Sequence, residues 1–134
     1  MTINDAHCHF FSPQFFSALV RQRGRTPAQS PAEVCRELQW DDPVTPDALA
    51  DRWVAELDAR GVARTALIAS VPGDEDSVAA AVARHPSRIV GFFMVDPSAA
   101  DAPERVRHAV NELGLAGVCL FPALHHVPLV DEHI

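Results

Sequence analysis

Lysine is absent from this sequence, and all 11 of its basic residues are arginine. With a net charge of −7 and an isoelectric point near 5.3, the chain is poorly suited to nucleic acid or an anionic membrane as its main partner. No apolar run approaches the ~18 residues that a membrane-spanning helix needs. The amino terminus has neither the basic start nor the apolar stretch of a signal peptide. We therefore expect a soluble, cytoplasmic chain.

Cysteine is scarce as well, and nucleotide-binding glycine motifs are missing. Cys8, Cys35 and Cys119 are widely spaced and include no Cys-x-x-Cys pair, which favours free thiols in a reducing compartment over a disulfide scaffold. Neither Gly-x-Gly-x-x-Gly nor a Walker segment occurs. A length of 134 residues with 48% hydrophobic content indicates one domain with a packed core.

The clearest chemical signal is a histidine pair in residues 3–10, a strand-like stretch that Pro13 brings to an end. Because residues two apart in a strand point to the same side, His7 and His9 should point together, with Asp5 one step behind. Two neutral imidazoles are half of a typical zinc shell, and Asp5 is a candidate acceptor for a ring N–H that would fix the tautomer. The alternative is a solvated or hydrogen-bonded pair without a metal.

The rest of the chain alternates between strand-like and helix-like patterns at the spacing of βα units. We predict strands over 3–10, 65–70, 89–95 and 118–121, and helices over 13–23, 46–60, 74–85 and 101–113. Right-handed crossovers would place the carboxyl ends of the parallel strands on one side, where a barrel carries its chemistry. Prolines at several positions predict an irregular insertion at about 25–45, with one turn of helix at 35–40.

Further candidate residues fall on or near this rim. His125 and His126 follow the fourth strand, and one of them is a candidate substrate contact or metal ligand; the alternative is a loop histidine bonded to backbone or water. Asp96 is a candidate rim carboxylate, although Asp-Pro after a strand is also common turn chemistry. Arg21 is a candidate for binding a substrate carboxylate by paired hydrogen bonds, the alternative being a solvated surface charge.

Residues 5–13, with the sequence DAHCHFFSP, resemble the first strand of the amidohydrolase superfamily. The likeness is greatest to the amidohydrolase-related group that includes aminocarboxymuconate-semialdehyde-decarboxylase-like enzymes, and it continues over 61–68, 91–97 and 114–122. It implies a TIM-type (β/α)8 barrel whose first strand carries a metal pair, here His7 and His9. It also implies a divalent cation, zinc or else manganese, and a small-molecule substrate. The reaction would be hydrolysis of an amide, ester or lactone, or non-oxidative decarboxylation of a small acid.

The sequence departs from this family in two respects. A complete barrel needs at least ~200 residues, so we expect the amino-terminal half, roughly four βα units over residues 1–134, with residues 129–134 opening a further helix. The family's third histidine, its late aspartate and the general base would then lie beyond Ile134. Either a missing carboxyl-terminal half or a second copy in a homodimer would supply them. Because the chain has no lysine, a single metal is expected rather than a lysine-bridged pair.

Two other functions stay open at this point. Metal-dependent nucleases of the TatD type begin with a similar Asp-x-His-x-His segment, but the Gly-Glu motif expected on a middle strand has no counterpart at residues 117–120. The other alternative is a non-catalytic half-barrel that acts as an interaction module or is a remnant. It predicts weak or absent metal binding, because only two good ligands are in view.

Overall fold

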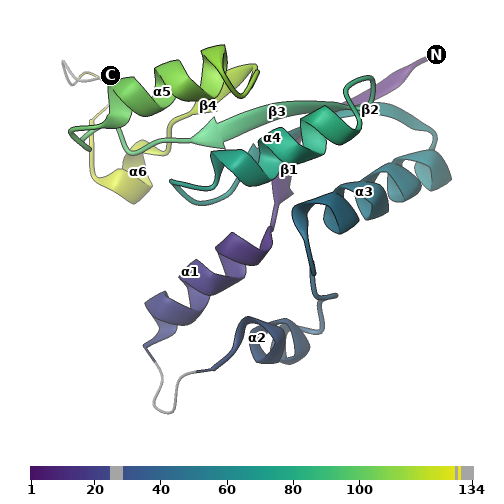
Figure 1. The fold of residues 1–134 in the computed structure, drawn as a ribbon, viewed down its shortest axis with the longest axis horizontal. Coiled ribbons are helices and arrows are strands. Elements are labelled where there is room, and N and C mark those ends of the chain that lie inside the picture. The colour runs from purple at the N-terminus through teal and green to yellow at the C-terminus, as the bar shows by residue number, and fades with distance from the viewer. Residues whose placement is uncertain (25–28, 129, 131–134) are drawn as a thin grey trace.

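The computed structural model describes residues 1–24, 29–128 and 130. Its four strands are all parallel and pair in chain order, β1-β2-β3-β4 (Figure 1). The strands are β1 (Ile3–Phe10), β2 (Val62–Ala69), β3 (Ile89–Met94) and β4 (Gly117–Cys119). The helices are α1 (Pro13–Arg23), α2 (Pro31–Leu38), α3 (Pro46–Arg60), α4 (Glu75–Arg84), α5 (Ala102–Asn111) and α6 (Pro122–His125). The prediction of an α/β fold with the parallel strands of a partial TIM barrel is confirmed, and the sheet is not closed.

Local chemistry sets most of the helix ends. Ser12 and Thr45 each accept a hydrogen bond from a backbone N–H three residues on, at 3.1 Å in both cases, and a proline follows each of them at the first helical position. Gly24 and Gly61 end α1 and α3 in the left-handed conformation that a Cβ disfavours. These are the boundaries that the sequence predicts.

Within the predicted irregular insertion at about 25–45, residues 31–38 form helix α2, so the prediction is wrong over 31–34, and the predicted turn of helix at 35–40 overlaps α2 over 35–38. Pro31 begins this helix instead of interrupting it, because the first helical position needs no backbone N–H. Ser30 and Glu33 form a capping box, with the Ser30 N–H donating to the Glu33 carboxylate at 2.7 Å. The helix therefore starts and ends earlier than the predicted turn at 35–40.

The end of the described chain also differs from the prediction. Strand β4 stops at Cys119, and Pro122 starts the short helix α6 where a loop is predicted. The helix predicted to open at 129–134 lies outside the described residues, apart from Val130.

The core lies between one face of the sheet and helices α3, α4 and α5. Phe10, Leu67 and Phe93 point from β1, β2 and β3 into it, and all three are fully buried. Gly91 on β3 lets α4 and the chain after α5 approach closely, since a Cβ there would meet side chains from both. The alternating residues of each strand point to the opposite face, which we call the inner face. His9 lies on it because it alternates with Phe10.

Helices α1 and α2 form a separate unit that extends away from the sheet (Figure 1). They pack around a small cluster of their own, made of Phe16, Val34 and Cys35. The three cysteines of the chain are free thiols. Among the described residues, no helix has both the length and the apolar character needed to cross a membrane.

Candidate metal centre at the end of the first strand

His7 and His9 converge at the carboxyl end of β1. Their Nε2 atoms lie 3.3 Å apart, and the two rings meet edge to face with centroids separated by 5.1 Å. His7 is exposed and His9 is half-buried. The sequence predicts that the two side chains share a face, and the structure brings their Nε2 atoms together.

The separation of the two nitrogens fits a shared cation. Zinc binds histidine nitrogen at ~2.0–2.1 Å, so two ligands of a tetrahedral zinc lie about 3.3 Å apart. The same distance also suits a hydrogen bond from one neutral imidazole to the other, with the donor set by the tautomers. Two imidazole nitrogens at the carboxyl end of a parallel strand suit zinc better than manganese, which prefers oxygen ligands.

His9 is held on its other side by contacts from β2 and from the chain that follows β1. Its Nδ1 lies 3.0 Å from the Ser70 hydroxyl, directly after β2, and its ring stacks on Phe11 at a centroid distance of 5.7 Å. Burial, together with the neighbouring His7, lowers the pKa of the His9 imidazole. A lowered pKa keeps the ring neutral, which is the form that binds a metal.

The predicted partnership between Asp5 and a histidine ring does not form in this structure. Asp5 Oδ1 instead accepts the backbone N–H of His7 at 3.0 Å, and its carboxylate also interacts with Cys8. The His7 N–H, followed by the Cys8 contact, holds the pKa of Asp5 below its ordinary value. The pairing of β1 with β2 is irregular between Asp5 and Cys8, and this irregularity leaves the carboxylate beside the backbone.

A buried polar network fixes the loop that carries β1 into α1. Ser12 donates to Asp74, and the Ser77 hydroxyl donates to the other oxygen of the same carboxylate at 2.5 Å. Asp74 is 2% exposed, and this burial raises the pKa of its carboxyl despite the two hydroxyl donors. Because Asp74 follows β2, the network ties the end of β1 to the end of β2 beside the histidine pair.

The other rim candidates follow β3 and β4, and the ring of Phe121, which caps α6, has its centroid 6.5 Å from that of His9. Asp96 accepts the Ser98 N–H at 2.9 Å and the Ser98 hydroxyl at 2.7 Å, and these bonds lower the pKa of its carboxyl. His125 is half-buried near Asp96, and its Nδ1 is a buried atom with no hydrogen-bond partner in the described residues. His126 is exposed at the end of α6. Nothing in the described residues joins these side chains to His7 or His9, so their roles stay predictions.

Arg21 is exposed in the last turn of α1, where its charge complements the helix dipole. It is not among the residues that line the pocket beside the histidine pair, and a substrate role for it stays a prediction. That pocket has a volume of about 320 Å³. Its lining comprises His9, Phe11, Phe16, Trp40, Asp41, Pro43, Leu49, Arg52, Trp53 and Glu56.

Arg52 is the pocket residue that sequence reasoning missed. It lies on α3 beside Trp53, and no ion pair involves it within the described part of the chain. Its neighbour Glu56 pairs instead with Arg60 at 2.8 Å. From the sequence alone, Arg52 is one more charge on the exposed side of an amphipathic helix. The segment after α2, which contributes Trp40, Asp41 and Pro43 to the lining, makes Arg52 part of a cavity.

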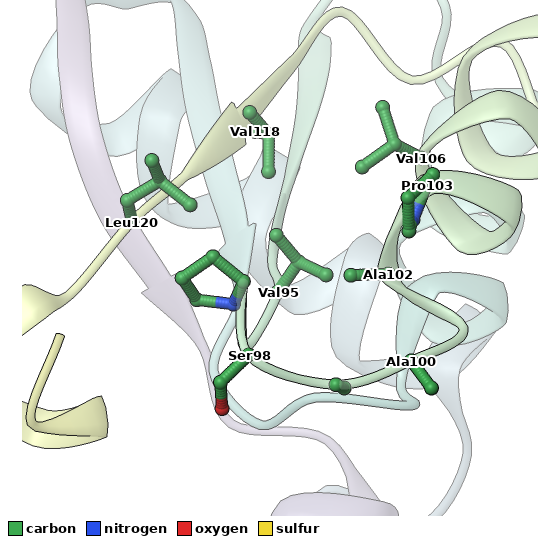
Figure 2. A pocket seen from close by; sticks show the side chains of 10 residues that line it. Val95, Ser98, Ala100, Ala102, Pro103, Val106, Val118 and Leu120 are labelled. Carbon is green, nitrogen blue, oxygen red and sulfur yellow. The ribbon is translucent and has the colours of Figure 1, made fainter. Parts of the chain in front are cut away.

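A larger cavity, about 670 Å³, lies at the other edge of the sheet and has a different character (Figure 2). The side chains that point into it include Val95, directly after β3, Val106 on α5, and Val118 and Leu120 on and just after β4. Its lining contains no histidine, cysteine or acidic residue. The smaller pocket, whose lining includes His9, is therefore the better candidate for substrate.

The histidine pair would supply two of the four ligands of a typical zinc shell. Within residues 1–24, 29–128 and 130, no group of three or more histidine, cysteine or acidic residues converges on a point that could hold a metal. The sequence matches the model of the amidohydrolase family over residues 4–134. No curated protein matches it significantly.

Proposed function

The chain belongs to the amidohydrolase family, and from this membership we propose that it serves a metal-dependent reaction of hydrolase type, with His7 and His9 as two of the cation's ligands. The observation that carries the proposal is the 3.3 Å separation of the two Nε2 atoms at the carboxyl end of a parallel strand. When bound, a zinc or manganese ion polarises a substrate oxygen or lowers the pKa of a water to about 7. His9, half-buried and neutral, would be the rigid ligand, and exposed His7 the adaptable one.

We further propose that the substrate is a small molecule with a planar apolar part and an anionic group. Support comes from the pocket beside His9, where Phe11 stacks on Trp40 at a centroid distance of 5.2 Å and Arg52 supplies a cation. An amide, ester or lactone would be hydrolysed there, and a small acid could instead be decarboxylated. The remaining ligands and the general base would come from outside the described residues or from a second copy of the chain.

A zinc titration followed by calorimetry tests the metal site. We expect His7→Ala and His9→Ala each to weaken zinc binding by more than about tenfold, since each removes one of two ligands. His108→Ala is the matched control, because His108 is exposed on α5 and contacts Glu112 at 3.0 Å. Equal zinc affinity in the wild type, His7→Ala and His9→Ala would contradict the assignment of a metal site to these two histidines.

A second candidate function rests on the incomplete shell. If the described residues hold only two ligands, a non-catalytic half-barrel that serves as an interaction module is the alternative. It predicts no stoichiometric zinc binding by the wild type at any concentration that leaves the protein folded. The same titration therefore separates the two candidates.

A further inference from the structure

Ser70 lies where β2 ends, next to the part of β1 that carries the histidine pair. His9 pairs with Ile68 in the register of the two strands, and Ser70 follows two residues later on the same face. Its hydroxyl is 3.0 Å from His9 Nδ1 and 3.1 Å from the Ile68 carbonyl oxygen. Both contacts are within hydrogen-bonding distance.

The hydroxyl has one proton, and the two contacts determine where it goes. A carbonyl oxygen can only accept, so Ser70 donates its proton to Ile68. Its oxygen must then accept from His9, which requires a proton on His9 Nδ1. In a neutral imidazole the other nitrogen is then bare, and this Nε2 is the atom that faces His7.

His7 has no comparable support. Its backbone N–H is bonded to Asp5, but no partner holds its ring Nδ1 within the described residues. With His9 Nε2 bare, the 3.3 Å contact is a hydrogen bond donated by His7 Nε2–H. His9 is thus fixed in one tautomer by the fold. His7 can move its proton to Nδ1, which would leave its own Nε2 available to a cation.

We propose that Ser70 is a positioning residue of this site, which holds His9 in the Nδ1–H tautomer and so presents the Nε2 lone pair to a divalent cation. The proposal deepens the proposed function and rests on it for the cation. The tautomer itself depends only on the contacts of His9 in the metal-free chain. The match to the amidohydrolase family covers residues 4–134 and assigns no role to Ser70.

The first test reads the tautomer directly. Nitrogen-15 NMR of the metal-free chain, at a pH well above the imidazole pKa values, distinguishes Nδ1–H from Nε2–H histidine. We expect His9 to be Nδ1–H in the wild type and in Ser70→Thr, which keeps the hydroxyl. In Ser70→Ala we expect it to shift toward Nε2–H, the form that an unconstrained imidazole prefers. Ser98→Ala is the control, because its hydroxyl bonds Asp96 on the same rim and should leave His9 unchanged.

The second test measures zinc affinity in the same four proteins. Removing a partner that orients a ligating histidine costs ~10–100-fold in metal affinity, so we expect that loss for Ser70→Ala and near wild-type binding for Ser70→Thr and Ser98→Ala. If Ser70→Ala keeps both the tautomer and the affinity, the proposal is overturned. If the tautomer shifts but the wild type binds no zinc, the proposed function fails while the tautomer assignment stands.

Discussion

Gly91 shows how a single position controls the packing behind the candidate site. A Cβ added there would lie 2.5 Å from Leu115 and 2.9 Å from both Val78 and Val82. These distances are shorter than real Cβ contacts allow, and three side chains would have to move at once. The strand that bears Gly91 pairs with β2, whose end carries Ser70.

We predict that Gly91→Ala lowers the free energy of unfolding by ~1–3 kcal/mol, the usual cost of overpacking a core. Urea unfolding would measure it. Combining it with Val82→Ala removes one of the clashing side chains, so the double variant should lose less stability than the sum of the two single variants. Strictly additive losses would show that the clash is relieved in another way.

At the residue scale, the sequence predicts the histidine pair but not its surroundings. A strand has a period of two, which is enough to place His7 and His9 on one face. The role of Ser70 depends on the pairing of β1 with β2, and that of Arg52 on the position of the segment that follows α2. Neither arrangement can be read from local sequence. The predicted contact between Asp5 and a histidine ring does not form. The pairing of β1 with β2 is irregular between Asp5 and Cys8, and the alternation of residues along a strand does not predict such an irregularity.

Helices α3 and α4 are joined by a charged cluster on their exposed surface. Asp51 accepts two hydrogen bonds from Arg84, at 2.6 and 2.7 Å, and a third contact from His85 at 2.7 Å. The Arg84 bonds, followed by the His85 contact, lower the pKa of Asp51 from its ordinary 3.8 to about 2. Asp51, Arg84 and His85 do not line the pocket beside His9, so this cluster bears on stability.

We predict a stability contribution from Asp51 that depends on pH. Because its pKa is lower in the folded chain than in the unfolded chain, the stabilisation is fully present above pH ~4 and is lost as the pH falls toward about 2. Asp51→Asn should make the unfolding free energy fall less steeply over that range. Asp47→Asn, at 3.9 Å from Arg84 on the same helix, is the control. If the unfolding free energy of Asp51→Asn depends on pH as that of the wild type does, the cluster does not contribute to stability.

At the element scale, the caps explain which helices were predictable. Thr45-Pro46 and Gly61 mark both ends of α3, and these signals are local in sequence. The start of α2 was not predicted, because Pro31 is one of several prolines that were interpreted as helix breakers. Ser30 and Glu33 nevertheless have the spacing of a capping box. Helix α6 shows the limit of such signals, because its four residues carry too little pattern. The strand predicted over 118–121 forms as β4, but with three residues only, Gly117–Cys119.

The whole molecule is a curved parallel sheet with two edges. Within the described residues, β1 and β4 each pair with one strand only, so their outer backbone groups are available to another strand. Beside β4 lies the larger apolar cavity, with Val118 41% exposed at its margin (Figure 2). An unpaired strand next to apolar surface is a site of association.

We predict that the chain self-associates with rising concentration and that Val118→Lys reduces this association, since a charge on an edge strand opposes pairing. Sedimentation velocity over a range of concentrations measures it. Val110→Lys is the matched control, because Val110 is 44% exposed but lies on α5. An equal effect of both variants would mean that net charge, and not the β4 edge, controls association.

The measurement that bears most directly on the central claim is anomalous X-ray diffraction, at the zinc absorption edge, from crystals soaked in zinc. We predict a peak at ~2.0–2.1 Å from the Nε2 atoms of both His7 and His9. The peak should be absent from crystals of His9→Ala soaked in the same way. A peak at other side chains only, such as His108 with Glu112, or no peak at all, would contradict the assignment of the metal centre to the end of β1.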